Sequence, residues 1–334
     1  MRVLVTGGAG FIGSHVAGAL AGRGHEVTVF DDLSGGFSEN VPAGTAFVHG
    51  SVTDADAINR LFEAQRFDYV YHLAAYAAEG LSHFIKRFNY TNNVIGSVNV
   101  INASINHDVK GFVFTSSIAV YGSSPAVPMT ELTPAAPEDP YGIAKYAVEQ
   151  ELAASHTMFG LKYVIFRPHN VYGPRQNIGD RYRNVVGIFM NQILQDQPMT
   201  IFGDGTQTRA FTYIDDVAPV MAAAIETPAA WNETFNVGAD RPYSLNALAD
   251  LVAAAMGVEP RVEHLPARHE VWHAHSSHDK IKDVFGGGNP TPLESGLQVM
   301  AEWVKRQGAR SSRAFDGIEI MRGLPPSWAR AAKA

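Results

Sequence analysis

The sequence has no cysteine among its 334 residues. Disulfide bonds, thiolate nucleophiles and cysteine-based zinc sites are therefore excluded, and we expect no metal site. The chain also lacks any apolar run of the roughly 20 residues that a membrane-spanning helix needs. Met1 leads directly into a strand-like segment, which leaves no room for a signal peptide. Together these absences predict a cytoplasmic protein with no membrane partner.

Positive charge is also in short supply, since 26 lysines and arginines stand against 33 aspartates and glutamates. The resulting formal net charge of −7 argues against nucleic acid as a partner. An anionic ligand would have to be bound by local arginines instead. The composition, 46% hydrophobic and 18% charged, is that of an ordinary globular protein, and the length suggests one large or two moderate domains.

The N-terminal segment combines a strand, a glycine turn and a helix. Residues 2–6 form a short apolar run typical of a buried parallel strand, and residues 14–23 have helical periodicity. The glycines between them let the backbone approach a pyrophosphate closely, and the free N–H groups of a helix N-terminus favour the anion. This pattern predicts the phosphate-binding turn of a dinucleotide cofactor. Its residues are Gly7, Gly10, Phe11, Ile12 and Gly13.

A second apolar run, residues 26–30, ends in Asp31 and Asp32. An acidic side chain about twenty positions after the glycines can bind both hydroxyls of an adenosine ribose. The same carboxylates would repel a 2′-phosphate. The sequence therefore predicts NAD as the cofactor, in preference to NADP.

Tyr141 and Lys145 are one helical turn apart, and Ser117 precedes them at the end of another strand-like run. A phenol, an ammonium and a hydroxyl within reach of one another can move a proton on a carbinol. This is the proton half of a hydride transfer. The three residues are therefore the predicted catalytic group.

Strand-like and helical runs alternate along the first half of the chain. Further strands are expected at 45–49, 68–73, 111–116 and 162–167, and helices at 54–65, 92–107 and 141–159. This alternation predicts an α/β fold with a doubly wound parallel sheet of the Rossmann type.

The composition of the sequence changes after Arg167. Arginine, asparagine and glycine become frequent there, and prolines interrupt the apolar stretches. We predict an NAD-binding domain at 1–174 and a smaller α/β substrate-binding domain at 175–310, with segments near 211–237 returning to the main sheet. The C-terminal tail, 311–334, is expected to pack on the rest of the chain. The apolar residues that suggest this packing are Phe315, Ile318, Ile320, Leu324 and Trp328.

Eight motifs occur in a characteristic order. They are Gly7-x-x-Gly10-x-x-Gly13, Asp31-Asp32-Leu33-Ser34, His72-Leu73-Ala74-Ala75, Asn93-x-x-Gly96, residues 117–122, Tyr141-x-x-x-Lys145, Arg167-Pro168-x-Asn170-x-Tyr172-Gly173-Pro174 and Gly203-Asp204-Gly205-x-Gln207-x-Arg209. Over about 1–305, the chain resembles the extended short-chain dehydrogenase/reductases that act on nucleotide sugars, UDP-glucose 4-epimerases especially.

The resemblance implies a role for each catalytic residue. Tyr141 would take the proton of a sugar hydroxyl, and Ser117 would hydrogen-bond the same oxygen. Lys145 would hold the nicotinamide ribose and, with the nicotinamide cation, lower the pKa of Tyr141. Further NAD contacts are implied for Ser51, Val52, Leu73, Ala74, Ala75 and Asn93.

For the sugar nucleotide, with UDP as the expected carrier, the resemblance favours Asn170, Arg209 and Arg268 as ligands. It also implies a homodimer built on the helices at 92–107 and 141–159. The apolar positions proposed for that interface are Val94, Val98, Ile101, Ile105, Ala144, Val148 and Leu152.

Some segments depart from the usual epimerase pattern. Ser51 stands where family members often have an aspartate that contacts adenine, and Ala210 replaces a common aspartate. The segment 76–89 looks more like the corresponding loop of GDP-mannose 3,5-epimerases. Glu79, His83 and His169 therefore either face an unusual sugar or are solvated loop residues.

Residues that this chain lacks also help to distinguish among the reactions that this family catalyses. Dehydratases carry acidic residues just after the catalytic hydroxyl, where this chain has Ile118 and Ala119. Epimerases of the 3,5 type use a cysteine, and none is present. Ser117, Tyr141 and NAD suffice for 4-epimerisation through a ketone, which is the predicted reaction. The alternatives are another nucleotide-sugar modification, a net NAD-linked dehydrogenase, or an NAD-binding regulator without activity.

Overall fold

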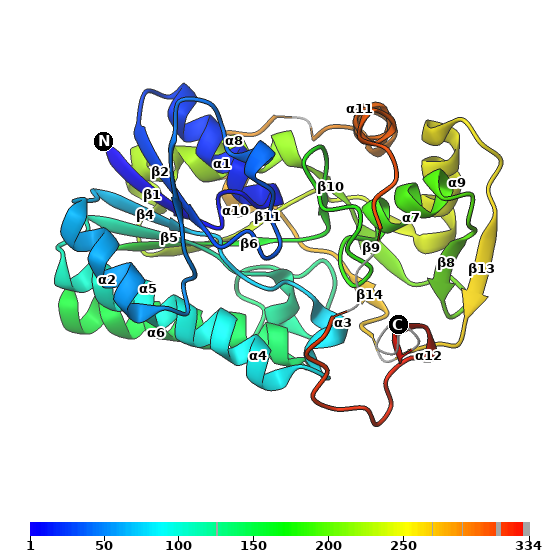
Figure 1. Cartoon of the computed structure of the whole chain (residues 1–334), viewed down its shortest axis with the longest axis horizontal. Coiled ribbons are helices and arrows are strands. Elements are labelled where there is room, and N and C mark those ends of the chain that lie inside the picture. The colour runs from blue at the N-terminus through cyan, green and yellow to red at the C-terminus, as the bar shows by residue number, and fades with distance from the viewer. Residues whose placement is uncertain (125, 269, 289, 312–314, 330–334) are drawn as a thin grey trace.

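A seven-stranded parallel sheet dominates the computed structural model, which describes residues 1–124, 126–268, 270–288, 290–311 and 315–329 (Figure 1). The strand order is β11-β6-β5-β4-β1-β2-β3. The strands are β1 (Arg2–Thr6), β2 (Glu26–Asp31), β3 (Ala46–His49), β4 (Tyr69–His72), β5 (Gly111–Thr115), β6 (Tyr163–Pro168) and β11 (Glu233–Val237). Every pairing is parallel. The predicted doubly wound sheet is confirmed.

Helices cover both faces of this sheet (Figure 1). One face carries α1 (Phe11–Gly22), α8 (Ala218–Ala222) and α10 (Asp279–Phe285), and the other α2 (Ala55–Ala64), α5 (Gly96–Asn106) and α6 (Pro140–Phe159). Within β1, Val3 and Val5 pack towards α1 and α8, whereas Leu4 packs towards α2 and α5. Alternate residues of a strand point to opposite faces, so a strand covered on both sides must be apolar throughout.

The helix predicted at 92–107 begins earlier than expected. α4 (Lys86–Tyr90) continues through a wider helical turn, Thr91–Ile95, into α5. Asparagine lowers helix propensity, which hides this start in the sequence. In the fold, the Asn92 amide donates to the Phe88 carbonyl at 2.9 Å, so the side chain supports the helix.

The second lobe holds α7 (Val185–Leu194), α9 (Leu245–Met256) and α11 (Leu293–Gln307) beside small sheets. Its strands are β7 (Val171–Tyr172) with β10 (Thr212–Tyr213), β8 (Met199–Phe202) with β13 (Val262–Leu265), and β9 (Thr208–Ala210) between β12 (Pro242–Ser244) and β14 (His273–Ala274). Short helical pieces complete the chain: Ser38–Asn40, α3 (Glu79–Ser82), Ile118–Tyr121, Ile214–Asp216, Ala223–Glu226, Pro228–Ala230 and α12 (Pro326–Ala329).

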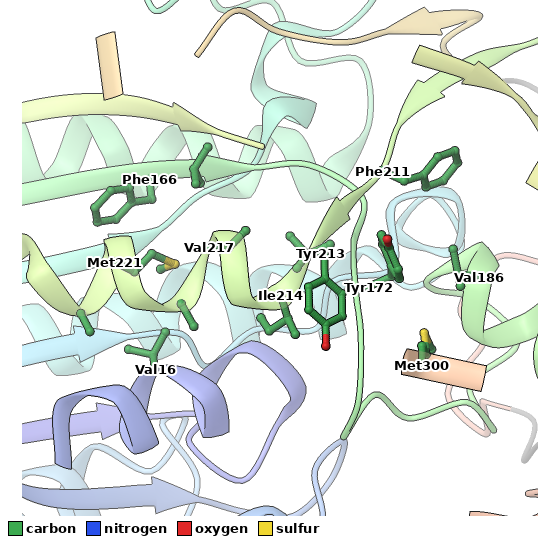
Figure 2. Packing of buried hydrophobic residues seen from close by; sticks show 14 of the residues in the cluster. Val16, Phe166, Tyr172, Val186, Phe211, Tyr213, Ile214, Val217, Met221 and Met300 are labelled. Carbon is green, nitrogen blue, oxygen red and sulfur yellow. The ribbon is translucent and has the colours of Figure 1, made fainter. Parts of the chain in front are cut away.

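The chain leaves the main sheet after β6 and later returns to it. β11 pairs with β6, with Phe235 opposite Phe166, and α8 packs on α1. One apolar core therefore runs through both lobes. Figure 2 shows it extending from Val16 and Phe166 at the main sheet to Val186 and Met300 in the second lobe.

The C-terminal tail folds back against the segment around α3 and α4 (Figure 1). The residues of this tail cluster are Ala78, Leu81, Ile85, Leu324 and Trp328, with Tyr76, Phe84, Phe88, Tyr182, Phe315 and Ile318 around them. The predicted packing of the tail is confirmed for Phe315, Ile318, Leu324 and Trp328, while Ile320 is 37% exposed. Residues 312–314 and 330–334 lie outside the described part.

Four of the positions proposed for a dimer interface are wrong. Ile101, Ala144, Val148 and Leu152 are at most 1% exposed, because they pack on the chain's own sheet and helices. The sequence of α6 is apolar on several sides, so its periodicity does not reveal which side faces inward. Large apolar side chains exposed near these positions include Ile95, at 52%, and Ile143, at 42%, and Met158 and Phe159 are exposed at the C-terminal end of α6.

Candidate active site

A cavity of about 920 Å³ lies around the carboxyl ends of β1, β2, β4, β5 and β6. This edge is where doubly wound sheets bind their ligands. The second lobe and the tail form the remaining walls, through residues such as Arg209 and Trp328. The cavity is thus long enough to involve both lobes.

The glycine turn borders this cavity and requires glycine for steric reasons. Gly7 has a φ of 71°, and a Cβ there would stand 2.6 Å from the Ala74 nitrogen. A Cβ on Gly13 would stand 2.1 Å from the Gly7 carbonyl oxygen. Within the described residues no side chain caps the N-terminus of α1, and Gly10, Phe11, Ile12 and Gly13 all line the cavity. The turn fits a pyrophosphate bound by backbone N–H groups.

Asp31 supports this turn as well as lining the cavity. Its carboxylate accepts hydrogen bonds from the Ala9 N–H at 3.0 Å and the Leu33 N–H at 2.8 Å. Burial raises the pKa of Asp31, and these N–H groups oppose that effect. Asp32 also lines the cavity and accepts from the Ser34 N–H at 2.9 Å.

The other predicted cofactor contacts divide into two groups. Val52, Leu73, Ala74 and Ala75 line the cavity, whereas Ser51 and Asn93 are not among its lining residues. The Ser51 hydroxyl lies 3.0 Å from the Thr53 hydroxyl.

Asn93 lies behind the cavity wall. Its side chain accepts from the Tyr76 N–H at 2.8 Å and donates to the Tyr76 carbonyl at 3.0 Å. It thereby fixes the loop that follows β4, and its amide is already engaged by protein groups.

The three predicted catalytic residues meet at the cavity wall. Ser117 caps the helical turn Ile118–Tyr121 by accepting from the Ala119 N–H at 3.1 Å, and its hydroxyl lowers the pKa of the Tyr141 phenol. Tyr141 lies in the first turn of α6, which Asp139 caps by accepting from the Gly142 N–H at 2.9 Å. Proline at the next position favours the start of a helix there.

Lys145 follows Tyr141 by one turn and is 3% exposed. Its ammonium donates to the Thr115 carbonyl at 2.8 Å and lies 5.8 Å from the centre of the Tyr141 ring. Burial lowers the pKa of Lys145 to about 7, although Glu149 opposes the shift.

In the chain alone, the pKa of Tyr141 is raised; the lowering by Lys145 and the nicotinamide cation concerns the NAD-bound enzyme and stays a prediction. Burial is the main cause of the raised pKa, and the Ser117 hydroxyl opposes it. The charges of Asp139 and Glu79 raise the pKa further, whereas Arg183 lowers it. Desolvation disfavours the charged phenolate more than the nearby donors favour it.

A buried ion pair supports the catalytic group from beneath. Arg167 and Glu149 approach to 2.5 Å, and the Ser116 hydroxyl donates to Glu149, also at 2.5 Å. Arg167 donates to the Tyr121 hydroxyl at 2.8 Å, which donates to Asn236 at 2.7 Å. This network joins β5, β6, β11 and α6 directly below Ser117 and Lys145. Sequence reasoning gave these residues no role.

The arginines predicted for a diphosphate also line the cavity. Arg209 donates to the carbonyls of Thr208 (2.8 Å), Trp272 (3.0 Å) and Val271. Both Arg209 and Arg268 pair with Glu270, at 3.7 and 3.4 Å.

Arg268 lies against two aromatic rings, Phe202 and Trp328, which contact each other edge to face. Its guanidinium lies 4.4 Å from the Phe202 ring centre and 5.8 Å from that of Trp328. Asn170 lines the cavity too, with a φ of 42°, and donates to the Ala210 carbonyl at 3.1 Å.

Glu79, His83 and His169 line the same cavity. Burial raises the pKa of Glu79 to about 7. His169 is buried and lies 3.0 Å from His278, Nε2 to Nε2. Of the two interpretations left open by the sequence, a position facing the ligand cavity is the one that the placement favours.

Three further residues of the cavity wall escaped sequence reasoning. Asp139 could have been found, because Asp-Pro before a helical run signals a capped helix start. Glu270 and Trp328 carry no such local signal, since they reach the cavity only through the fold of the second lobe and the tail.

Residues 3–238 match the NAD dependent epimerase/dehydratase family. The chain belongs to this family. It is 34% identical to a UDP-glucose 4-epimerase of Mycolicibacterium smegmatis, over 92% of this chain and 99% of that protein. Its activity is that of an NAD-dependent nucleotide-sugar epimerase, similar to the UDP-glucose 4-epimerases.

Two solved structures extend the comparison. The UDP-glucose 4-epimerase of Thermotoga maritima, solved with UDP-glucose, is 37% identical with a TM-score of 0.87, covering 92% of this chain and 99% of that one. The UDP-glucuronic acid 4-epimerase of Bacillus cereus, solved with UDP-glucuronic acid and NAD, is 29% identical with a TM-score of 0.84, covering 92% of this chain and 100% of that one.

NAD is the cofactor of the family, and the glycine turn with Asp31 fits it. Among the residues that the structure describes, no group of three or more His, Asp or Glu is placed to hold a metal ion. In the same part of the chain, no helix is both long and apolar enough to cross a membrane.

Proposed function

We propose that the chain inverts C4 of a UDP-hexose of the glucose/galactose type, or of the corresponding uronic acid or N-acetyl sugar. The observation that carries this proposal is that Ser117, Tyr141 and Lys145 meet at the wall of the dinucleotide cavity. The next residues, Ile118 and Ala119, are apolar and cannot move a proton for elimination.

Tyr141 removes the proton from the C4 hydroxyl and later returns it, while Ser117 donates a hydrogen bond to the same oxygen. NAD, when bound, would supply the acceptor and later the donor of the C4 hydride, together with a positive charge beside the phenol. Lys145, on the next turn of α6, holds the nicotinamide ribose. The proton and the hydride both come back to the sugar, so the reaction is balanced without another reactant.

Arg209 and Arg268 bind the diphosphate. Arginine offers several N–H donors to phosphate oxygens, and both guanidiniums face the cavity. UDP is the expected carrier because the chain is similar to an enzyme solved with UDP-glucose and to another solved with UDP-glucuronic acid.

One observation favours a second candidate, epimerisation at C3 or C5. Glu79 lines the cavity with a pKa of about 7, so it could exchange a carbon-bound proton beside a 4-ketone. Such exchange would introduce hydrogen from solvent, whereas the C4 reaction would not.

Proton NMR of the enzyme with UDP-glucose, UDP-galactose and their uronic acid and N-acetyl relatives in D₂O tests the proposal. We expect a C4 epimer without deuterium at carbon and with NAD unchanged. Deuterium at C3 or C5 would support the second candidate. Stoichiometric NADH release would indicate a dehydrogenase, loss of water a dehydratase, and absence of any turnover a regulator.

A further inference from the structure

Glu79 has no part in the proton transfer between Ser117 and Tyr141, yet it lines the same cavity. The residue is deep in the fold but exposed to the cavity space. Ser82 donates a hydrogen bond to its backbone carbonyl at 2.6 Å. Among the described residues, no donor is hydrogen-bonded to the carboxyl itself. The carboxyl is therefore open to a bound ligand.

The position of Glu79 follows from its neighbours. Its charge raises the pKa of Tyr141, and it also acts on Arg209, whose pKa is lowered by burial. At the next residue, a Cβ on Gly80 would stand 3.6 Å from a terminal nitrogen of Arg268. Glu79 thus shares the cavity wall with the phenol and the two arginines and is close enough to act on them through its charge. A sugar whose C4 oxygen meets Tyr141 and whose diphosphate meets the arginines therefore lies in the same cavity as Glu79.

The short helix that carries Glu79 is fixed in place on the side of the catalytic tyrosine. The Tyr141 N–H donates to the Ser82 hydroxyl at 3.2 Å, and this hydroxyl lies 3.4 Å from Asp139. Because α3 is tied to the start of α6, the distance between Glu79 and Tyr141 is set by the backbone.

The surrounding charges favour a neutral sugar at this point. Asp139 and Glu270 carry the same charge as Glu79 and raise its pKa, while Arg209 and Arg268 lower it. A bound diphosphate would neutralise the positive charge of the two arginines. The negative charge of the carboxylates would then dominate around the sugar.

Arg183 is a cation whose charge lowers the pKa of Tyr141. It already pairs with Asp180 at 2.6 Å and stacks on the Tyr76 ring at 4.9 Å. Its charge is therefore largely balanced before a sugar arrives.

We propose that Glu79 selects the sugar: it hydrogen-bonds hexoses that present hydroxyl groups and rejects hexuronic acids, which present a carboxylate. This inference rests on the proposed function and narrows its substrate class to neutral sugars. A carboxylate beside Glu79 would be repelled, whereas hydroxyl donors would satisfy it.

The discrimination should depend on pH. Glu79 has a pKa of about 7 among Asp139, Tyr141, Arg209, Arg268 and Glu270. Above pH 7 the ionised Glu79 carboxylate repels a uronate. Below pH 7 Glu79 is protonated, and the repulsion is weaker. The ratio of affinities for a neutral and an acidic sugar nucleotide should therefore fall as the pH drops from 8 to 6.

The test is calorimetric titration of the NAD-bound enzyme with UDP-glucose and UDP-glucuronic acid at pH 8 and pH 6. At pH 8 we expect UDP-glucose to bind on the order of tenfold more tightly, a difference of about 1.4 kcal/mol. Glu79→Gln, which keeps the shape and removes the charge, should bring the two affinities within about threefold and abolish the pH effect. Glu63→Gln, on the exposed side of α2, is the matched control for net charge.

Equal or tighter binding of UDP-glucuronic acid by the natural chain would overturn the inference, as would an unchanged ratio in Glu79→Gln or binding of neither ligand. If that variant does not fold, the pH dependence of the natural chain decides. Because binding is measured apart from turnover, the expected affinities without C4 inversion would refute only the proposed function. Preferential inversion of UDP-glucuronic acid would refute only the role of Glu79.

Discussion

Ser117 and Tyr141 line the same cavity wall, and the Ser117 hydroxyl lowers the pKa of the Tyr141 phenol against the burial that raises it. The same serine oxygen accepts from the Ala119 N–H at 3.1 Å, which fixes its position at the end of β5. Ser117 is therefore held by the backbone while it points to the phenol. The pair is preorganised for one oxygen atom of a substrate.

Tyr141→Phe should fold and bind NAD normally but lose most of its activity. Removing the proton acceptor costs on the order of 10² to 10⁴ in rate. Activity is measured by NMR and NAD affinity by calorimetry. Tyr146→Phe, a phenol removed from the same helix outside the cavity lining, is the matched control. Near-normal turnover in Tyr141→Phe would refute its role as the base.

Asp31→Asn should weaken NAD binding by on the order of tenfold and narrow the preference for NAD over NADP, because one charge-assisted contact to the ribose is lost. The asparagine oxygen can still accept from the turn that Asp31 supports through the Ala9 N–H. Fluorescence titration with both cofactors measures the effect, with the exposed Asp56→Asn as control. Equal affinity of the natural chain for NADP and NAD would contradict this assignment.

Arg268→Ala should raise KM for the nucleotide sugar by about 10- to 100-fold with little change in kcat, since a charge-assisted contact is worth roughly 1.5–3 kcal/mol. Trp328→Ala should shift KM in the same direction, because one ring of the stack that orients Arg268 is removed. Arg261→Ala, at an exposed pair with Asp196, is the control. An unchanged KM in Arg268→Ala would exclude it as a diphosphate ligand.

Lys145→Met should alter the pH dependence of stability. The pKa of Lys145 is about 7 in the fold against an ordinary value of 10.5. The unfolded chain therefore binds more protons between these values, so this lysine makes stability rise with pH from 7 to 10.5. Urea unfolding at pH 7 and 9.5 should show that rise in the natural chain but not in Lys145→Met, by at most on the order of a few kcal/mol. The exposed Lys162→Met should behave like the natural chain, and parallel profiles for all three proteins would refute the shift.

The chain should form a homodimer through the exposed side of α6 and the neighbouring helical turn. Ile95 and Ile143 are large apolar side chains exposed near the N-terminal half of α6, and Met158 and Phe159 are exposed at its C-terminal end. Light scattering should report a dimer that Ile143→Glu weakens, while Val299→Glu, at an exposed site on α11, does not. A monomeric natural chain at micromolar concentration would refute this proposal.

The sequence was most informative where structure depends on local pattern. Apolar runs and three-residue glycine spacing predicted β1, the turn and α1, because both steric needs and backbone hydrogen bonds are local there. The face of α6 that packs inward could not be predicted, since Ala144 and Leu152 belong to a helix that is apolar on several sides. Which face of α6 is buried depends on where the helix lies against the sheet.

Contacts between segments far apart in the sequence could not be predicted either. Glu149 and Arg167 pair across α6 and β6, and the Trp328 ring reaches Arg268 from the tail. Asn93 belongs to a recognisable motif, but its bonds to Tyr76 place it behind the cavity wall. A motif can thus predict that a residue matters without predicting which atom it touches.

The return of the chain to the main sheet means that neither lobe is one continuous piece of sequence. A fragment ending at residue 174 would lack β11 and α8, which pair with β6 and pack on α1. It would expose the β6 edge and the surface beneath Phe235, both of which favour aggregation. Swapping substrate lobes between relatives by a single fusion joint should therefore give insoluble protein, whereas a chimera that exchanges 175–210, 238–278 and 286–310 while keeping the returning segment and α10 would preserve the sheet.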